Sequence, residues 1–375
     1  MEHTDRKNRL SITRLLVASD VAAHPLVEEI AARLRLEPEV PAGVPVLDTT
    51  DAEQWRQGKK TLYLCRNQGK FLKSCPGTRE YHCCGYQVLN VGMNCPYACV
   101  YCILQAYLNN PWLSFFVNLD DLCQEVAKNL AGDRGRLHRI GTGEFTDSLV
   151  LDHVTALSTR LVPFMAAQAN AVLELKTKSV QIANLQGLDH GGKTIVSWSL
   201  NTMDVVQREE IYATSIEERL QAAVRCTDWG YALGFHFDPI IYHPGWEKGY
   251  AEVIDRLFQT VDPEKIVWIS MGALRFLPDL KKIAQNRFPG SRFFFQEEFI
   301  DGLDGKKRYF RELRAEMYHF IFQRLKKRAA PSTCIYFCME GDELWHEVMD
   351  ILPRKQGGVD AMLDRAVYEH FPFLR

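Results

Sequence analysis

From residue 86 onwards, short apolar runs alternate with stretches of helical, amphipathic periodicity. Such alternation is typical of repeated β/α units, in which parallel strands form a sheet that helices cover. Six strands are expected, at residues 86–92, 138–143, 172–177, 194–200, 232–238 and 265–271. Helices are expected between them, at residues 119–131, 152–168, 215–230 and 250–261. The pattern predicts an α/β fold with a partial (β/α)6 barrel of the TIM type, whose chemistry lies at the carboxyl ends of its strands.

The domain organisation follows from two irregular segments. The chain has 375 residues, which suits either two average domains or one large barrel. A proline-rich stretch at residues 36–48 and a glycine-bearing segment at 301–305 are the best candidate boundaries. We expect a small N-terminal α+β subdomain over residues 1–80, the barrel over 81–290, and a C-terminal extension with a basic hairpin and helices over 291–375.

The composition is that of an ordinary globular protein, with 25% charged residues and a formal net charge of −2. Such a balance excludes a general affinity for polyanions, so nucleic acid would have to bind a local basic patch. The N-terminus lacks a secretory apolar region, and no apolar stretch of about 18 residues occurs that suits a membrane span. We expect a cytoplasmic protein without a membrane partner.

Eleven cysteines in a chain of this kind indicate metal or catalytic use, because the cytosol keeps thiols reduced. Cys95, Cys99 and Cys102 lie in one short loop directly after the first expected barrel strand. Three thiolates bind three irons of a [4Fe-4S] cluster and leave the fourth iron open. An open iron can chelate the amino and carboxylate groups of S-adenosylmethionine (SAM) and pass an electron to its sulfonium. The spacing therefore predicts a radical SAM enzyme.

A zinc site is the alternative interpretation of this loop. Zinc also takes clustered thiolates, and a distant His or Cys would complete a tetrahedral set. Zinc motifs usually space their cysteines in pairs, which favours the iron–sulfur cluster. Tyr101, directly before the last cysteine, is in a position to lie against the adenine of SAM, although a lone tyrosine more often only packs.

From about residue 60 to 320 the chain resembles the spore photoproduct lyase family of radical SAM enzymes. The matching segments occur in order with compatible spacing: CVYCILQAYL, VNLDD, TDSLVLDH, LKTK, GGKTIVSWSLN, ERLQAAV, GFHFDPIIYHPGWEKGY and the Arg-Phe of ALRF. That family reverses an ultraviolet-induced thymine dimer in DNA. The resemblance implies a radical SAM barrel, a [4Fe-4S] cluster, SAM, damaged DNA as partner, and a reducing electron donor such as flavodoxin or ferredoxin.

By position, the resemblance implies three contacts to SAM. Thr146 and Lys178 correspond to residues beside the SAM carboxylate, and Ser199 corresponds to another hydroxyl beside SAM. A lysine facing a carboxylate is a charge-assisted contact. From the residues alone, Thr146 would serve as a helix N-cap and Ser199 as a buried hydroxyl bonded to the backbone.

His236 and Asp238 alternate on one expected strand and therefore share a face. With His243 nearby, they raise the question of a second metal. A polar barrel interior that contacts SAM or substrate is the preferred interpretation, so we expect Asp238 on the SAM side of the site.

Two departures from the family matter. The family's hydrogen-donating cysteine aligns with Glu144, and one of its two relay tyrosines aligns with Ile103. The turn that ends in Gly143 and Glu144 resembles the Gly-Gly-Glu turn with which many radical SAM enzymes bind the amino group of SAM. We expect Gly143 and Glu144 to contact SAM, and Tyr101 to remain the candidate redox-active catalytic residue. Without the family's donor, the final hydrogen atom would come from another residue or be returned by 5′-deoxyadenosine. Alternatively, the enzyme would act on a different substrate.

Further cysteines lie just upstream of the loop, at Cys65, Cys75, Cys83 and Cys84. They would form an auxiliary cluster, provide a substitute hydrogen-donor thiol, or pack in the core. Packing is favoured, since free cysteine is among the most buried residue types and adjacent cysteines rarely ligate one metal. Cys334 and Cys338 are also expected in the core.

A basic segment follows the expected boundary at residues 301–305. Lys306, Lys307, Arg308 and Tyr309 combine positive charge with an aromatic ring, which suits contact with a phosphate backbone and a base. In the resembled family a hairpin near this position enters the DNA. An equally good interpretation is a solvated turn that leads into an amphipathic helix.

Taken together, the sequence predicts a lyase that cleaves a thymine dimer photoproduct in DNA through a 5′-deoxyadenosyl radical. Two alternatives stay open. One is a radical SAM enzyme that acts on another nucleic acid or a metabolite. The other is a non-catalytic iron or zinc protein that binds nucleic acid.

Overall fold

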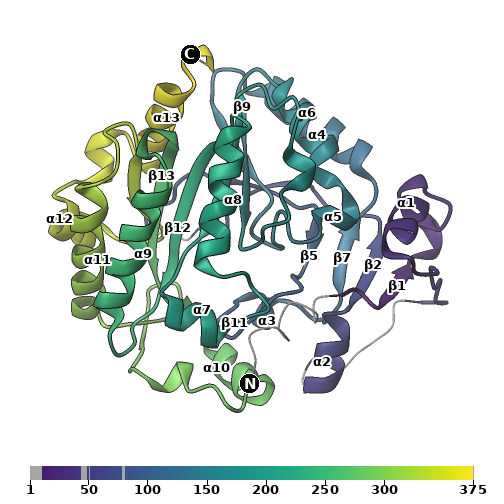
Figure 1. Cartoon of the computed structure of the whole chain (residues 1–375), viewed down its shortest axis with the longest axis horizontal. Coiled ribbons are helices and arrows are strands. Elements are labelled where there is room, and N and C mark those ends of the chain that lie inside the picture. The colour runs from purple at the N-terminus through teal and green to yellow at the C-terminus, as the bar shows by residue number, and fades with distance from the viewer. Residues whose placement is uncertain (1–10, 44–48, 50, 78–80, 375) are drawn as a thin grey trace.

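The structure is a computed structural model that describes residues 11–43, 49, 51–77 and 81–374. Its core is an eight-stranded sheet that curls into a half-barrel (Figure 1). In spatial order the strands are β17 (Cys334–Phe337), β13 (Ile266–Ala273), β12 (Ala232–Ile240), β10 (Thr194–Ser199), β9 (Ala171–Thr177), β8 (His138–Gly141), β4 (Gln87–Leu89) and β3 (Leu72–Ser74). All neighbours are parallel except β3 and β4. The predicted partial barrel and its six strands are confirmed.

The barrel strands are buried on both faces, which explains their continuous apolar runs. Every residue of β10 and of β13 is buried. Helices cover the outer face of the sheet, and α8 and α9 lie in front of it in Figure 1. The covering helices are α4 (Leu119–Gly132), α5 (Asp152–Thr155), α6 (Leu157–Ala166), α8 (Ile216–Asp228), α9 (Trp246–Thr260), α11 (Arg311–Lys326), α12 (Asp342–Met349) and α13 (Val359–His370). Ser215 and Glu218 start α8 with a reciprocal capping box.

One expected helix is divided in two. The sequence predicts a single helix over residues 152–168, but the chain breaks it at Ala156, which has a positive φ of 49°. The carboxylate of Asp152 accepts hydrogen bonds from the backbone N–H and the hydroxyl of Ser158, at 2.8 and 2.6 Å. Asp152 therefore caps the first turn of α6, which compensates for the break.

A second sheet joins the N-terminal segment to the cysteine loop (Figure 1). Its strands, in spatial order, are β1 (Arg14–Val17), β2 (Thr61–Cys65), β7 (Leu113–Phe116) and β5 (Gly92–Met93). Helices α1 (Pro25–Leu34), α2 (Ala52–Gly58) and α3 (Leu104–Tyr107) accompany it. The sheet takes strands from both sides of the boundary expected near residue 80. Of the boundary expected at 36–48, residues 44–48 lie outside the described part of the chain.

The C-terminal segment is also tied to the barrel. Strand β17 extends the large sheet beside β13, and three short strands form a separate antiparallel sheet: β14 (Arg275–Phe276), β16 (Lys307–Arg308) and β15 (Ile300–Asp301). The remaining elements are α7 (Met203–Glu209), α10 (Pro278–Arg287) and the pair β6 (Ala98–Cys99) and β11 (Glu210–Ile211). Short 3₁₀ turns complete the described part of the fold, at Ser19–Val21, Ala183–Leu185, Pro263–Lys265, Phe293–Phe295, Pro353–Gln356 and Pro372–Leu374. Within the described ranges, no helix has the length and apolar character needed to cross a membrane.

Candidate active site

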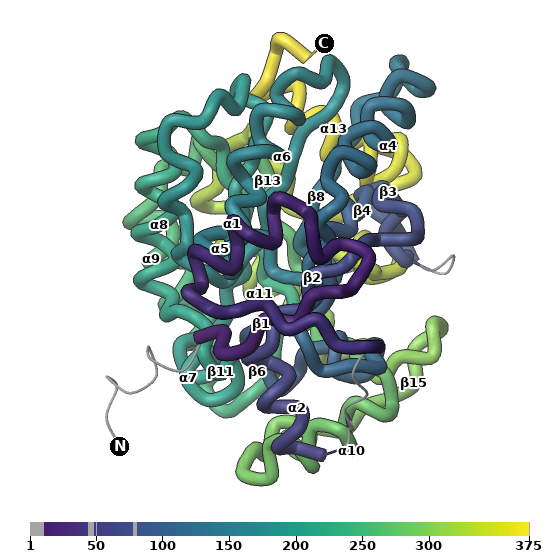
Figure 2. Tube along the Cα trace, turned by 90° about the vertical axis from the view of Figure 1, so that its right-hand side faces the viewer, coloured from purple at the N-terminus to yellow at the C-terminus, as the bar shows by residue number. Residues whose placement is uncertain are grey.

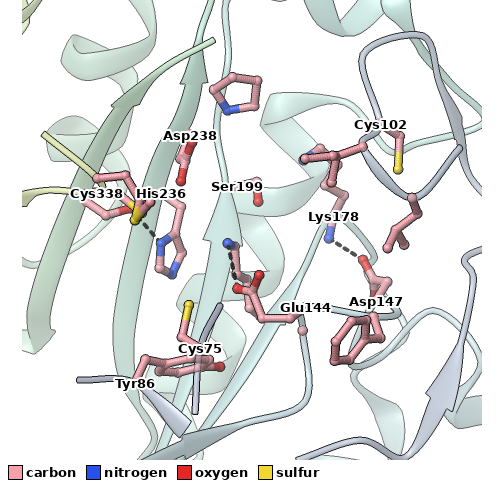
Figure 3. A pocket seen from close by; sticks show the side chains of 18 of the residues that line it. Cys75, Tyr86, Cys102, Glu144, Asp147, Lys178, Ser199, His236, Asp238 and Cys338 are labelled. Carbon is pink, nitrogen blue, oxygen red and sulfur yellow. Dashed lines mark hydrogen bonds and ion pairs between the residues drawn. The ribbon is translucent and has the colours of Figure 1, made fainter. Parts of the chain in front are cut away.

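A cavity of about 340 Å³ opens where the barrel strands reach their carboxyl ends. Figure 3 shows side chains from several strands and loops that point into it. The cavity brings together all ten residues that the sequence predicts for the cluster and SAM: Cys95, Cys99, Cys102, Tyr101, Gly143, Glu144, Thr146, Lys178, Ser199 and Asp238. Ile103, which the resemblance aligns with one of the family's relay tyrosines, lines the same cavity.

The three loop cysteines share one end of this cavity. Cys99 is buried in β6 and pairs with Glu210 of the antiparallel strand β11. Cys95 and Cys102 are half-buried. None of them is in a disulfide. Among the described residues, no three His, Cys, Asp or Glu side chains converge closely enough to hold a single metal ion. A cubane cluster binds each of its cysteines through a different iron, so a spread set of three thiols on one loop fits a [4Fe-4S] cluster.

Glu210 is a buried acceptor that the sequence did not single out. Its carboxylate accepts hydrogen bonds from the Tyr101 hydroxyl and, at 2.6 Å, from Nη2 of Arg219. Nζ of Lys178 lies 3.9 Å from the same carboxylate and 5.9 Å from the centre of the Tyr101 ring. Burial works to raise the pKa of Glu210, but Arg219 and Lys178 together hold it below its usual value. This ionised carboxylate fixes Tyr101 and Lys178 beside the cysteine loop.

The glycines of the Gly-Thr-Gly-Glu turn are required by packing within the chain. A Cβ on Gly141 would lie 1.8 Å from the Tyr86 hydroxyl oxygen, and one on Gly143 would lie 2.7 Å from the Lys176 Cβ. Oε1 of Glu144 lies 3.8 Å from Nζ of Lys176. Burial opposes the charge on Lys176, but Glu144 and Asp238 raise its pKa above the usual value. The turn thus presents a carboxylate to the cavity with a lysine behind it.

The end of β9 positions the other expected SAM contacts. The Asp147 carboxylate accepts hydrogen bonds from the Thr177 hydroxyl at 2.6 Å and from the Lys178 backbone N–H at 2.7 Å. The second contact is dashed in Figure 3. Ser199 is buried at the end of β10, and Thr146 is half-buried beside Asp147. The cavity therefore has hydroxyls and an ammonium group close to the cysteine loop.

Asp238 belongs to an ion pair on the opposite wall. Nη1 of Arg275 lies 3.3 Å from Oδ1 of Asp238, and Nη2 donates to Sγ of Cys338 at 3.2 Å. Placing Cys338 in the core was wrong, because its half-buried thiol lines the cavity. Burial is the main cause that raises the pKa of Cys338 to about 11, so the thiol keeps its proton at neutral pH.

His236 lies in a buried network and not in a metal site with His243. Oε1 of Glu174 accepts hydrogen bonds from His236 at 2.8 Å, and from Ser197 and Trp268 at 2.6 and 2.9 Å. Burial alone would raise the pKa of Glu174, but His236 and the other donors lower it to about 2. His243 instead contacts the Thr202 hydroxyl, at 2.8 Å. These contacts support the polar interior expected for this strand.

The additional cysteines separate into different environments. Cys75 and Cys84 line the cavity, Cys83 is exposed, and Cys65 lies half-buried in β2. Burial, with Glu144 as the strongest charged neighbour, raises the pKa of Cys75 far above its usual value. Cys75 therefore presents a neutral S–H group to the same cavity as Glu144.

The basic hairpin faces inwards more than the sequence indicates. Lys306 lines the cavity, and Lys307 forms an ion pair of 2.9 Å with Asp301. Arg308 and Tyr309 are only 1% and 2% exposed. Nη2 of Arg308 donates to Oδ2 of Asp304 at 2.8 Å within the hairpin. Nη1 of Arg308 donates to the backbone oxygen of Met339, just after β17, at 3.2 Å, and the Tyr309 hydroxyl accepts from the backbone N–H of Tyr242. Their expected contacts with DNA are therefore corrected, because both side chains hold the hairpin on the barrel.

A half-barrel of parallel strands with a three-cysteine loop after its first strand defines a radical SAM enzyme. The model of the spore photoproduct lyase family matches residues 43–337 of the chain. The chain belongs to the spore photoproduct lyase family.

Curated relatives and solved structures agree with this assignment. Spore photoproduct lyase of Geobacillus sp. (strain Y412MC61) is 27% identical over 295 residues, which are 78% of this chain and 82% of the relative. The enzyme of Bacillus subtilis (strain 168) is 25% identical over 281 residues, or 74% and 78% of the two chains. A doubly substituted spore photoproduct lyase with bound AdoMet and dinucleoside spore photoproduct has the same fold, with a TM-score of 0.78 and 23% identity over 88% of this chain and 100% of that one.

Proposed function

We propose that the chain is a radical SAM carbon–carbon lyase that cleaves a thymine dimer photoproduct in DNA. The observation that carries the proposal is the shared cavity, in which the three loop cysteines, Glu144 and Lys178 face one space. The names of the curated relatives support the same reaction. So does the bound pair of AdoMet and dinucleoside photoproduct in the solved relative.

Each expected cofactor has residues suited to hold it. Cys95, Cys99 and Cys102 would ligate three irons of a [4Fe-4S] cluster. Lys178 and Thr146 would hold the SAM carboxylate, and Glu144 would hold its amino group, since opposite charges then meet in a water-poor cavity. When bound, the cluster and SAM supply a 5′-deoxyadenosyl radical that removes a hydrogen atom from the photoproduct.

The remaining residues around the cavity have supporting roles in this proposal. Ser199 offers a hydroxyl to the SAM ribose or carboxylate, and Gly143 leaves room at the turn. Asp238 would contact SAM or substrate from the opposite wall, where Arg275 keeps it ionised. Tyr101, fixed by Glu210, lies between the cysteine loop and Lys178 and is the candidate for radical transfer.

We assign the missing hydrogen donor to Cys75. Its S–H group lines the cavity, and burial together with the charge of Glu144 raises the pKa of Cys75, which keeps the thiol protonated. After the bond between the bases breaks, Cys75 would give its hydrogen atom to the product radical and become a thiyl radical. The thiyl radical would regain a hydrogen atom from the methyl group of 5′-deoxyadenosine, which would become the 5′-deoxyadenosyl radical again. Cys338, another cavity thiol with a raised pKa, is the alternative donor.

DNA would approach from the side of the β15–β16 hairpin. Lys306 in the cavity wall and Lys307 on the hairpin offer charge to phosphates, and Leu303 near the tip is 74% exposed. An exposed apolar side chain beside an active-site mouth suits insertion next to an extruded dinucleotide. Extrusion costs a few kcal/mol and is cheapest for a damaged, poorly stacked site.

The proposal is tested by incubating anaerobically reconstituted, reduced protein with SAM and a synthetic thyminyl-dihydrothymine dinucleotide. Formation of thymine that requires SAM is the expected result. Cleavage of SAM without formation of thymine would reject this substrate and favour an enzyme that acts on another nucleic acid or a metabolite. Glu144 and Ile103 favour that alternative, because the resemblance aligns them with the family's cysteine and tyrosine. Absence of iron or of SAM cleavage would favour a non-catalytic iron or zinc protein. A flavodoxin or ferredoxin as electron donor, and the cytoplasm as location, belong to the same proposal.

A further inference from the structure

A buried lysine from outside the barrel contacts the cysteine loop. Lys59, at the C-terminal end of α2, is only 8% exposed. Its Nζ donates to Oδ1 of Asn94 at 2.7 Å and to the backbone oxygens of Cys95 and Tyr97 at 2.6 and 3.3 Å. Three acceptors around one nitrogen match the three N–H donors of an ammonium group.

The lysine supports the point where the loop begins. Asn94 has a positive φ of 73°, and its Oδ1 also accepts the backbone N–H of Cys95 at 2.9 Å. The Asn94 side-chain nitrogen donates to the backbone oxygens of Pro111 and Trp112, at 2.9 and 3.2 Å. Lys59 thus reinforces a backbone conformation that places the first cysteine, and its loss would leave these buried oxygens short of a donor.

A second cation supports the other end of the loop. Nη1 of Arg287, at the end of α10, donates to Oε1 of Gln105 at 3.0 Å. Gln105 in turn donates to the backbone oxygens of Cys99 and Val100, at 2.9 and 3.1 Å.

The two cations share one aromatic side chain. Nζ of Lys59 lies 5.2 Å from the centre of a Trp55 ring, and the guanidinium carbon of Arg287 lies 4.9 Å from the centre of a ring of the same residue. Helices α2 and α10 lie together at the lower edge of the molecule in Figures 1 and 2, where Trp55 also packs edge-on against Phe288. Cations on aromatic faces are favourable, particularly when they are desolvated. Trp55 therefore holds both supports against the loop.

The positive charges of Lys59 and Arg287 lie against the cysteine loop. Nζ of Lys59 is 2.6 Å from the backbone oxygen of Cys95. The guanidinium of Arg287 reaches the backbone oxygen of Cys99 through the side chain of Gln105. Net charge and nearby hydrogen bonds tune the reduction potential of iron–sulfur clusters, and a cation favours the reduced, more negative state.

We propose that Lys59 is a positioning residue that orders the cysteine loop and raises the reduction potential of the cluster bound there. The inference rests on the proposed function only for the presence of that cluster. It assigns a role to the N-terminal segment, which contributes none of the cavity residues expected to bind SAM.

The test is a redox titration of the reconstituted protein, monitored by the electron paramagnetic resonance of the reduced cluster and without SAM or substrate. Lys59→Met removes the charge and keeps the length of the side chain. At a fixed potential we expect its ratio of reduced to oxidised cluster to fall about tenfold, equal to about 59 mV for a one-electron couple. Lys59→Arg, which keeps the charge, is expected near the wild type. Lys60→Met, at the exposed neighbouring lysine, is the matched control.

Each outcome decides the inference. An unchanged midpoint potential in Lys59→Met with full iron content would overturn it. If Lys59→Met fails to retain iron, Arg287→Gln is titrated instead, and the same downward shift is expected because its charge also acts on the loop while Lys59 stays in place. An unshifted Arg287→Gln would then overturn the electrostatic role. Failure of the wild type to bind iron would contradict the proposed function itself, and is thereby distinguished from failure at Lys59.

Discussion

The Tyr101 hydroxyl donates a hydrogen bond to the carboxylate of Glu210, across the short pairing of β6 with β11. This contact joins the residue before the last loop cysteine to a segment more than 100 positions later in the chain. The same carboxylate neutralises Arg219, whose side chain is fully buried. The position of the candidate radical-transfer residue therefore depends on one buried charge.

Glu210→Gln is expected to destabilise the protein. The change leaves the Arg219 guanidinium buried without its counter-charge, which costs about 3 kcal/mol. Chemical denaturation of the cluster-free protein at pH 7 measures this loss. Glu217→Gln is the matched control, because its pair with Arg256 is exposed and worth less than about 1 kcal/mol. Equal stability of the two variants would contradict the role of Glu210.

Glu144→Gln is expected to weaken SAM binding about tenfold. A carboxylate binds an ammonium group through a charge-assisted hydrogen bond, which is roughly twice as strong as the neutral bond that Gln offers. Anaerobic equilibrium dialysis of reconstituted protein gives the dissociation constant. A dissociation constant equal to that of the wild type would remove Glu144 from the SAM site.

Cys75→Ser is expected to keep SAM cleavage and to lose most formation of repaired thymine. Serine preserves the shape of the side chain, but its O–H bond is too strong to quench a carbon radical. Cys338→Ser is the comparison variant, and product analysis of both measures thymine against 5′-deoxyadenosine. Loss of repair only in Cys338→Ser would move the donor to that thiol. Glu144→Cys, which restores a thiol at the family's position, is expected to rescue repair in the Cys75→Ser background at a SAM concentration that offsets its weaker SAM binding.

Acid stability is expected to depend on Glu174. Its pKa is lowered in the folded state, from an ordinary 4.5 to about 2. Its contribution to the free energy of unfolding is therefore fully present above about pH 4.5. The contribution is lost as pH falls from about 4.5 to 2, and amounts to about 3 kcal/mol. In Glu174→Gln, the stability of the cluster-free protein should therefore fall less steeply over this pH window. Parallel pH profiles for the two proteins would contradict the buried Glu174–His236 pair as its cause.

Changes in the hairpin are expected to weaken binding to damaged duplex DNA. Leu303→Ala removes an exposed apolar contact, while Lys306→Met removes one phosphate contact and should reduce the salt dependence of binding by about one ion. Fluorescence anisotropy at several salt concentrations measures both effects. Lys355→Met, at an exposed lysine outside the hairpin, should bind as the wild type does. Wild-type affinity in Leu303→Ala and Lys306→Met would rule out this approach of the DNA.

Local patterns in the sequence were sufficient for the barrel and for most of the cavity. Cys95, Cys99 and Cys102 are recognisable because one short loop supplies all three, and the residues at strand ends are found from the strand pattern. Glu210 and Lys59 could not be found in this way, because their contacts with the loop form only when distant segments pack.

The hairpin and one cysteine show a different limit of sequence patterns. Arg308 and Tyr309 are residue types that are common in nucleic-acid contacts. Inside the fold, however, Arg308 donates a hydrogen bond to Asp304, and Tyr309 accepts one from the backbone N–H of Tyr242. Charge and aromatic character do not reveal which side of a hairpin faces the barrel. Cys338 follows a buried strand and reads as core, but β17 ends at the cavity mouth.

Counting both products in one reaction tests the central claim most directly. Reduced, reconstituted protein is given SAM and the thyminyl-dihydrothymine dinucleotide, and thymine and 5′-deoxyadenosine are quantified together, with Cys102→Ala as the cluster-deficient control. The account predicts thymine formation that requires SAM and is absent in the control. Abundant 5′-deoxyadenosine with no thymine above the control would contradict it.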